Sequence, residues 1–273
     1  MRAMIDRTAD PRAARRLRIS VLLAAASALA ITPIGAQSGS AARGGDVTVH
    51  WIGHSAFEIV SPGGTRILID PFITANPAAP DSLKQLARYE GANKPAAILV
   101  SHAHFDHVGD AKAIAAATGA PVIGTGELVG SLGIPEAQAK GGSPGGSVTV
   151  GDVIVHLVPA MHSSEPGHPL GFVLEFPGGR TLYHTGDTWL FSDMALIEQL
   201  YRPSIVLLCV GGGPYTEDPK VAALAIRKYF HPTTIVPMHY GTFPGLATEG
   251  QVRAAFAGDR RLVVMTPGET RKF

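Results

Sequence analysis

The segment ILVSHAHFDHVGD, residues 98–110, places four metal-ligand side chains within six positions, directly after an apolar run. These side chains are His102, His104, Asp106 and His107. Neutral imidazole and carboxylate groups at such close spacing are ligands that attract divalent transition metals. The apolar run predicts a short buried strand, and the alanine-rich segment after it predicts a helix. The cluster should therefore lie in a strand-to-helix loop, where α/β proteins commonly carry out their chemistry.

Three further candidate ligands each follow a predicted strand. His162 follows in LVPAMHSS, Asp187 in LYHTGDT and His239 in TIVPMHY. With the first cluster they make a series of histidines and aspartates in a fixed order, which resembles the motifs of the metallo-β-lactamase superfamily. Asp70 in ILIDPF matches the first motif of that superfamily. The resemblance extends over residues 47–270.

A narrower resemblance involves longer segments of the chain. WIGHSAFEI, DPFITANP, HTGDTWLFSDMALIEQLYRPSIVLLCVGGG and VPMHYGTFP are similar to the small metal-dependent hydrolases related to L-ascorbate-6-phosphate lactonase. Most members of that group resemble cytoplasmic enzymes, whereas this chain begins with an apparent export signal.

The superfamily resemblance implies a site with two divalent metal ions. His102, His104 and His162 would hold one ion, Asp106, His107 and His239 the other, and Asp187 would bridge them. Two such ions can share a hydroxide that is a nucleophile at neutral pH. The implied activity is hydrolysis of a small ester-like substrate, such as a lactone or another carboxylic ester. Zinc is the expected metal, with manganese or iron as alternatives.

Other functions stay open at this point. Basic residues in the pocket would favour a phosphodiesterase, and the same ligands could serve a metal-binding protein without turnover or an iron-dependent redox protein. Penicillin hydrolysis is disfavoured, because the branches with that activity resemble sites with a cysteine or no bridging carboxylate where this chain has Asp187. HSS at 162–164 lacks the glycines of a nucleophile elbow.

Four residues near the motifs are candidates for supporting roles. The narrower resemblance puts His54, in GHSAF, beside the metals as a substrate contact or an outer hydrogen-bonding group, and a purely structural histidine is the alternative. Asp70 should brace the histidine loop by accepting hydrogen bonds. His184 could touch the substrate, although strand alternation separates its face from that of Asp187. Tyr240 could donate to a developing oxyanion or simply bury its ring.

The order of apolar segments predicts an α/β fold, a four-layer αββα sandwich in which two sheets pack face to face with helices outside. The segment KGGSPGGS at 140–147 is typical of a surface turn. The predicted strands are at 47–51, 56–60, 66–70, 97–101, 147–150, 153–159, 171–176, 181–186, 204–210, 233–238 and 261–266. The predicted helices are at 80–89, 110–120, 190–201, 218–230 and 248–258.

Residues 1–36 resemble a secretory signal peptide. Six arginines precede the uncharged run ISVLLAAASALAI, which ends in small residues and is shorter than the roughly 20 apolar residues of a spanning helix. We therefore expect a periplasmic or secreted protein without stable membrane insertion once the leader is cleaved. The pair Arg15-Arg16 leaves twin-arginine export open. Residues 37–46 should form a flexible tether and 47–273 a single hydrolase domain.

The charge balance changes when the leader is removed. It carries 6 of the 23 basic and 2 of the 22 acidic residues, so 17 basic and 20 acidic residues remain. A mildly acidic domain offers no electrostatic footprint for nucleic acid. A small molecule is therefore the expected partner.

The leader generates a direct prediction. The exported protein should begin at Gln37, because IGA ends the apolar run with small residues next to that position. N-terminal sequencing of the exported protein checks this expectation. Recovery of Met1 on exported protein would contradict it.

Overall fold

The computed structural model describes residues 45–273. The predicted leader at 1–36 lies outside this range, as does the tether apart from Gly45 and Asp46, which are exposed and belong to no strand. Within the described range, none of the helices has both the length and the apolar character needed to cross a membrane.

The first of two sheets is seven-stranded, with the order β13-β1-β2-β3-β4-β5-β6. Strands β13, β1, β2 and β3 pair antiparallel, and β3 to β6 pair parallel. The bounds are β1 Thr48–Gly53, β2 Ala56–Val60, β3 Arg66–Ile69, β4 Ala97–Leu99, β5 Val122–Thr125, β6 Ala139–Gly142 and β13 Thr270–Lys272.

The second sheet is six-stranded, with the order β12-β11-β10-β9-β8-β7. Strands β10, β11 and β12 run parallel, whereas β7 to β10 pair antiparallel. The bounds are β7 Ser147–Val150, β8 Val153–Pro159, β9 Leu170–Glu175, β10 Thr181–His184, β11 Ile205–Cys209 and β12 Thr234–Met238.

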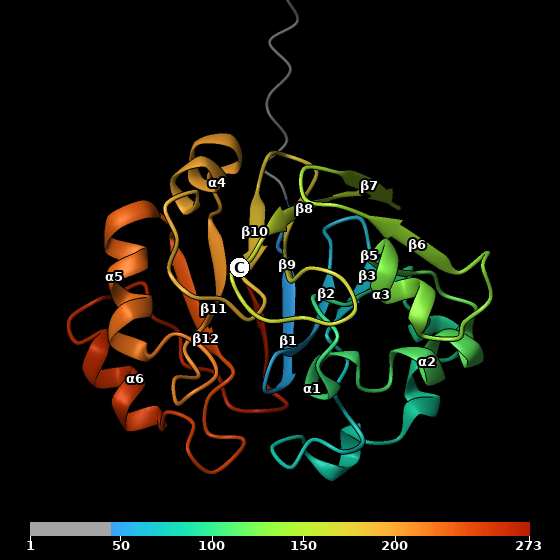
Figure 1. The fold of residues 1–273 in the computed structure, drawn as a ribbon, viewed down its shortest axis with the longest axis horizontal. Helices are drawn as coiled ribbons and strands as arrows, with labels where there is room; N and C mark the ends of the chain where they lie inside the picture. The colour runs from blue at the N-terminus through green and yellow to red at the C-terminus, as the bar shows by residue number, and fades with distance from the viewer. Residues whose placement is uncertain (1–44) are drawn as a thin grey trace, which may run out of the picture. The chain divides into compact units, whose positions relative to one another are not determined.

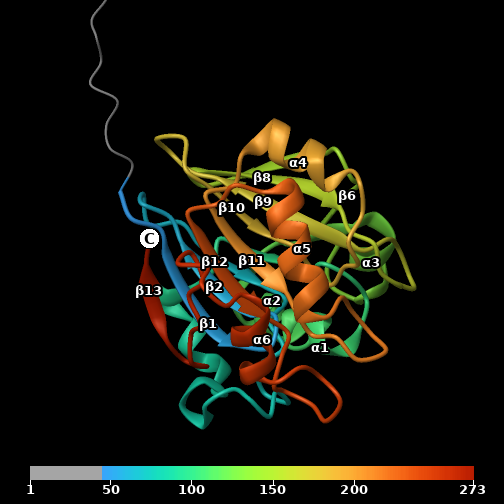
Figure 2. The same ribbon diagram turned by 90° about the vertical axis from the view of Figure 1, so that its left-hand side faces the viewer.

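Helices cover the outer faces of both sheets (Figure 1). Helices α4, α5 and α6 lie against the second sheet, and the turned view shows α5 and α6 outside β11 and β12 (Figure 2). Helices α2 and α3 lie against the first sheet. The helical segments are α1 Phe105–Val108, α2 Ala111–Thr118, α3 Gly126–Ser131, α4 Met194–Tyr201, α5 Pro219–Tyr229 and α6 Glu249–Ala255, with short 3-10 turns at Asp81–Leu83, Leu86–Tyr89 and Gly91–Asn93.

Strand alternation divides the apolar residues between two cores. In β3, Ile67 and Ile69 belong to the core between the sheets, whereas Leu68 packs with the residues of α2 and α3. Successive side chains of a strand point to opposite faces, so a strand buried on both faces reads as a continuous apolar run. The two flanked sheets confirm the predicted four-layer αββα architecture.

Three predicted elements differ from the structure. The helix expected at 80–89 is two 3-10 turns, because Leu83, Leu86 and Tyr89 recur every three residues, the period of that helix. The strand expected at 261–266 is only an isolated bridge at Leu262. That bridge is to Ile235 of β12 in the second sheet, whereas the last strand of the domain is β13, at the edge of the first sheet, whose residues are exposed and carry no apolar alternation.

The segment at 140–147 is only partly the turn that we expected. Its first residues belong to β6, which pairs with β5. A Cβ atom on Gly141 would lie 2.7 Å from the Cα of Gly126, so glycine lets this strand pass close to α3. Gly141 thus serves a close backbone approach, whereas Gly145, at φ +91°, lies in the turn between β6 and β7. Strand β5 and helices α1 and α3 were not predicted.

The histidine loop requires a glycine at position 109, and this requirement can be tested. Gly109 ends α1 at φ +41°, and an added Cβ would lie 2.5 Å from both the Cα of Phe72 and the carbonyl oxygen of Pro71. Gly109→Ala should therefore cost about 2–4 kcal/mol and lower the melting temperature by about 5–10 °C.

Gly130→Ala is the matched control, because a Cβ there meets nothing within 4 Å and the residue is helical. Removing a helical glycine should leave the melting temperature unchanged or slightly raised. Thermal melts of the two variants side by side measure the difference. Equal melting temperatures would show that the loop tolerates a side chain at Gly109.

Candidate metal centre

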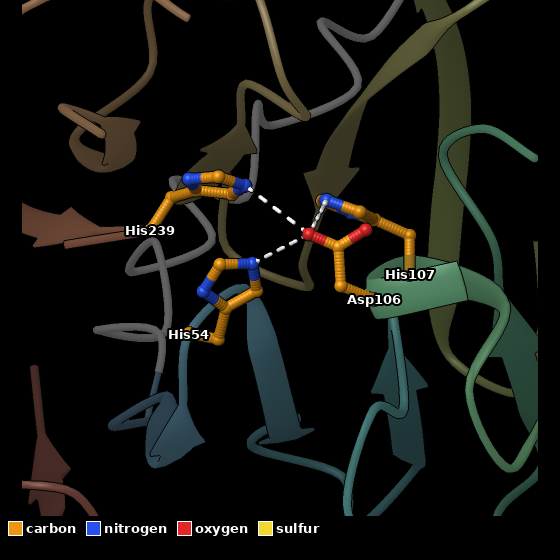
Figure 3. A group of neighbouring side chains, drawn as sticks. All are labelled: His54, Asp106, His107 and His239. Atoms are coloured by element: carbon orange, nitrogen blue, oxygen red, sulfur yellow. Dashed lines mark hydrogen bonds and ion pairs between the residues drawn. The ribbon is translucent and has the colours of Figure 1, made fainter. Parts of the chain in front are cut away.

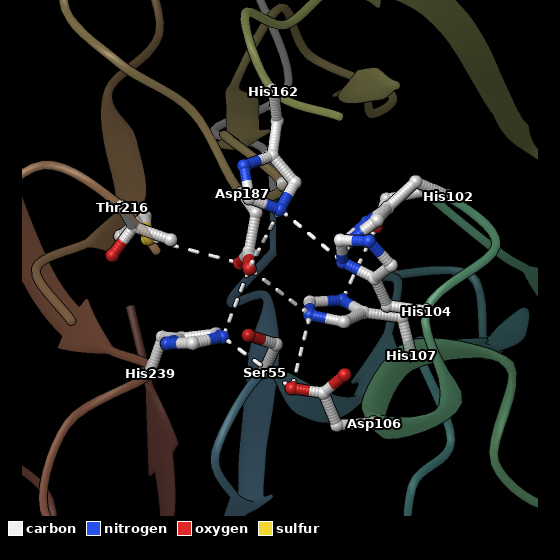
Figure 4. Close-up of polar contacts among 12 residues, drawn as sticks. Ser55, His102, His104, Asp106, His107, His162, Asp187, Thr216 and His239 are labelled. Atoms are coloured by element: carbon white, nitrogen blue, oxygen red, sulfur yellow. Dashed lines mark hydrogen bonds and ion pairs between the residues drawn. The ribbon is translucent and has the colours of Figure 1, made fainter. Parts of the chain in front are cut away.

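All seven residues predicted as metal ligands converge at one edge of the two sheets (Figure 4). Two come from the loop after β4 and two from the one-turn helix α1 that follows it. The others follow β8, β10 and β12. Because β10 and β12 run in the same direction, their carboxyl ends meet at the same edge. The candidate ligands that the structure brings together are His102, His104, Asp106, His107, His162, Asp187 and His239.

The first group of ligand atoms consists of three imidazoles. Nε2 of His102 lies 2.9 Å from Nδ1 of His104, and Nε2 of His162 lies 3.3 Å from the same atom. Two nitrogens that bind one tetrahedral zinc ion at its usual bond length lie about 3.3 Å apart. The spacing of these three nitrogens therefore suits a shared ion.

The second group surrounds the Asp106 carboxylate (Figure 3). Its Oδ2 lies 2.9 Å from Nε2 of His54, 3.6 Å from Nε2 of His239 and 3.9 Å from Nε2 of His107. Nε2 of His107 and both ring nitrogens of His239 are buried and make no hydrogen bond of suitable geometry among the described residues, although the Asp187 carboxylate lies close to both rings. Such orphaned nitrogens fit metal ligands, since buried polar atoms are otherwise almost always paired.

Asp187 lies between the two groups. Its Oδ2 is 2.9 Å from Nε2 of His239, 3.4 Å from Nε2 of His107 and 3.8 Å from Nε2 of His162. One carboxylate oxygen thus faces imidazoles from both groups, the position that a bridging ligand requires. A site of histidines and carboxylates at these distances fits a pair of divalent transition-metal ions.

Both carboxylates are held in their charged form. Burial alone would raise the pKa of Asp187, but the imidazoles of His239 and His107 hold it well below its usual range. Burial also opposes ionisation of Asp106, and contacts with His239 and His54 lower its pKa. The centre therefore offers two anionic ligands at neutral pH.

The imidazoles fall into two electrostatic classes. Burial lowers the pKa of His239, but the Asp187 charge overcomes it and raises the pKa to about 9. His107 follows the same pattern, with Asp187 and Asp70 raising its pKa. Burial lowers the pKa of His102, and the neighbouring His107 lowers it further. Positive charge is thus favoured next to Asp187, where a bound cation would supply it.

Asp70 lies behind the histidine loop, as predicted for a bracing carboxylate. It is fully buried and accepts hydrogen bonds from the backbone N–H and hydroxyl of Ser101, at 2.7 Å each. Its Oδ2 also accepts from Nδ1 of His107 at 2.7 Å. This contact fixes the ring so that Nε2 faces the centre, which is how carboxylates orient ligating histidines. Ser101 was not singled out in the sequence, although it directly precedes the first histidine.

His54 contacts the ligands and not the cavity. Burial and the nearby His239 lower its pKa to about 4, so the ring is neutral at pH 7. Nε2 donates to Asp106 at 2.9 Å, and Nδ1 accepts from the hydroxyl of Thr242 at 3.0 Å. Its ring centroid lies 3.9 Å from that of His239. These contacts support the outer hydrogen-bonding role over a substrate contact.

Backbone strain gathers at the same place. Of the four non-glycine residues with positive φ in the described range, three are His54, Asp70 and His239, at 57°, 47° and 65°. Such conformations cost about 1–3 kcal/mol each and persist where the surroundings hold them. The packing of the two sheets therefore supports strained backbone at the site.

His184 and Tyr240 take the second of the two positions that we left open for each, turned away from the cavity. His184 is fully buried, with Nε2 donating to the carbonyl of Ser55 at 3.1 Å and Nδ1 accepting from the N–H of Gly186 at 3.1 Å. Tyr240 stacks on Trp51 at 5.6 Å, and burial raises its pKa to about 12. Neither side chain lines the cavity beside the ligands.

Cys209 is a neighbour of the centre that its sequence context did not reveal. The thiol ends β11, and Sγ lies 3.8 Å from Oδ1 of Asp187, the oxygen turned away from the imidazoles. Burial, followed by the Asp187 charge, raises the pKa of the thiol well above its usual value, so it stays protonated and can donate. Its position at a strand end was the available signal, because neighbouring strand ends deliver ligands.

A cavity of about 320 Å³ opens onto the ligands. His104, Asp106, His162, Asp187 and His239 form its floor. Its walls are Phe105, Tyr215, Phe243, Pro244 and Leu246. A molecule in the cavity would therefore contact the ligand groups directly.

Fold and site together define a metal-dependent hydrolase of the metallo-β-lactamase fold. Residues 48–239 match the family model described as a beta-lactamase superfamily domain. The metallo-beta-lactamase fold protein YhfI from Bacillus subtilis superposes with a TM-score of 0.65, covering 84% of this chain and 100% of its own at 16% identity, which bears on the fold alone.

The chain belongs to the UPF0173 metal-dependent hydrolase family. The family member from Myxococcus xanthus is 44% identical over 250 residues, which cover 85% of each chain. Igni18, a metallo hydrolase from the archaeon Ignicoccus hospitalis, is 37% identical with a TM-score of 0.72 over 84% of this chain and 98% of its own. This family membership confirms the resemblance seen in the motifs.

Asp70 provides a test of how the ligands are held. Asp70→Asn keeps the shape but removes the charge that orients His107, so metal affinity should fall by about 10–100-fold. Competition with a chromophoric chelator measures that affinity. Asp81→Asn is the control, because its side chain is 98% exposed and pairs only with Lys84. Unchanged affinity in Asp70→Asn would refute the bracing role.

Proposed function

We propose that this metal-dependent hydrolase uses two divalent ions to cleave a small ester-like substrate, a lactone or another carboxylic ester. The observation that supports two ions is the position of Asp187 Oδ2, which faces imidazoles of both ligand groups at 2.9–3.8 Å. His102, His104 and His162 would hold one ion. Asp106, His107 and His239 would hold the other. Zinc suits this mixture of imidazole and carboxylate ligands, and manganese and iron are the alternatives.

Bound ions would supply a water nucleophile at neutral pH and would polarise the scissile carbonyl. The chain's own residues would then position the ligand side chains and keep bulk water away from the substrate. Asp70 holds Nε2 of His107 toward the centre, and His54 holds Asp106 by donating from Nε2. The Cys209 thiol faces the outer oxygen of Asp187 and leaves the inner one for the ligand groups. The apolar cavity walls limit bulk water around the substrate.

The phosphodiesterase alternative receives less support. It would be favoured by cations that neutralise a phosphate, yet no lysine or arginine is among the described residues that line the cavity. Elemental analysis of protein from its native compartment, with a panel of lactones, thioesters and phosphodiesters, distinguishes the remaining alternatives. Metal without any turnover would indicate a binding protein, and iron without hydrolysis would indicate redox chemistry.

Asp187→Asn tests the two-ion proposal. A neutral amide is a poorer ligand than a carboxylate, so the variant should lose about one equivalent of metal. Turnover should fall by two to three orders of magnitude, which corresponds to about 2.7–4 kcal/mol of lost transition-state stabilisation. Metal content and ester hydrolysis are measured on the same preparation.

Asp81→Asn serves again as the control and should keep both properties of the parent protein. Circular dichroism should show that both variants are folded. Full activity and two equivalents of metal in Asp187→Asn would overturn the bridging assignment and point to a site with a single ion.

A further inference from the structure

Large apolar side chains are exposed at the cavity. The described residues leave eight such side chains exposed; two of them line the cavity, and Met161 and Trp189 lie one and two positions from the candidate ligands His162 and Asp187 in the sequence. Phe105 and Tyr215, at 70% and 66% exposure, line the cavity itself. Met161 directly precedes His162, and its carbonyl accepts from the N–H of Trp189 at 2.8 Å. Exposed apolar groups gathered at a cavity mark a binding surface, whereas scattered ones need no explanation.

Phe105 belongs to a packed aromatic cluster and not to a loose loop. Its ring lies 5.8 Å from that of Phe72, edge to face, and 6.2 Å from that of Phe243. Phe72 and Phe243 both contact the His54 ring, at 6.0 and 5.5 Å. Distances of this size are those of stabilising aromatic pairs. Phe105 is therefore held in place beside Asp106 while most of its ring remains exposed.

The cavity lacks a partner for a charge remote from the scissile bond. Asp106 and Asp187 are the only side chains of the described lining that are charged at neutral pH in their usual forms, and both are proposed metal ligands. A phosphate or carboxylate group elsewhere on the substrate would meet Phe105, Tyr215, Phe243 or Leu246. Burying an unpaired charge against such walls is unfavourable. An apolar group gains free energy from the same contacts.

We infer that the cavity takes an uncharged ester whose acyl group is apolar and packs against Phe105, Tyr215 and Phe243. This inference rests on the proposed function and specifies its substrate class. The volume of about 320 Å³ lies at the small end of ligand pockets, which suits a medium-length chain or one ring. Phe105 is then the residue that determines specificity.

Metal-loaded full-length protein should be assayed with p-nitrophenyl acetate and octanoate. Each buried methylene contributes about fourfold, so octanoate should have a kcat/KM at least about tenfold higher than acetate. A second pair compares p-nitrophenyl heptanoate with mono-p-nitrophenyl adipate, which places a carboxylate at the end of a chain of similar length and too far from the ester to form a five-membered anhydride. The anionic ester should react at least about tenfold more slowly.

Phe105→Ala should lower kcat/KM for octanoate by about tenfold and for acetate by less than about twofold. Leu200→Ala is the matched control, because Leu200 is 69% exposed on α4 and does not line the cavity. Tyr215→Ala replaces Phe105→Ala if circular dichroism shows that the latter is unfolded. Calorimetric binding of 2-octanone against 2-butanone adds a readout without a scissile bond.

The outcomes separate this inference from the proposed function. Ester hydrolysis without a chain-length preference, or with equal kcat/KM for the adipate and heptanoate esters, overturns the inference and leaves the proposed function standing. Tighter binding of 2-octanone that is lost in Phe105→Ala, without hydrolysis of any ester, supports the apolar site and overturns the proposed function. Absence of both hydrolysis and ketone binding overturns both.

Discussion

The negative charge of Asp187 is the constraint on which the rest of the centre depends. The residue is buried, so its carboxylate has lost the water that would stabilise it and needs compensating positive charge from its neighbours. Its Oδ2 faces three imidazoles and its Oδ1 faces the Cys209 thiol. A buried anion among these imidazoles is stable when positive charge lies beside it, whether as protons on the rings or as a bound cation, and the donor set is the one that divalent transition metals prefer.

The two sheets must pack correctly before this arrangement exists. The first sheet delivers the histidine loop after β4, and the second delivers Asp187 and His239 after β10 and β12. The core between the sheets contains residues of both, such as Leu99 and Leu207, and it sets the distance between the two sets of ligands. The left-handed backbone of His239 and His54 depends on the same packing. Stability and site geometry are therefore aspects of one interface.

The sequence predicts the ligands better than their surroundings, for a physical reason. Histidine and aspartate at the ends of apolar strands can be recognised as candidate ligands from their residue type and position, since the ends of parallel strands meet at one edge of a sheet. The supporting contacts of Ser101, Thr242 and Cys209 cannot be recognised in this way, because each of these side chains could equally form a local hydrogen bond or be buried as a small group. His184 shows the limit of prediction from sequence. Strand alternation predicts that its side chain points away from Asp187, but nothing in the sequence predicts its hydrogen-bond partner, the carbonyl of Ser55, which lies 129 positions earlier. In the sequence Phe105 is only the residue between two candidate ligands, and its exposed position in the cavity wall becomes clear only in the structure. Strand β13 carries no apolar pattern, so only its pairing with β1 reveals it.

That pairing makes the domain's first and last strands hydrogen-bonded neighbours. Val47 and Phe273 exchange backbone hydrogen bonds, and the N–H of Trp51 donates to the carbonyl of Glu269. The Trp51 indole in turn donates to the carbonyl of His54 at 2.9 Å, which ties the sheet edge to the metal centre. The ribosome makes β1 well before β13, so β1 waits for its edge partner while the rest of the domain is synthesised. Closure of the first sheet is therefore a late event in folding, and it forms the contacts of greatest sequence separation among the described residues.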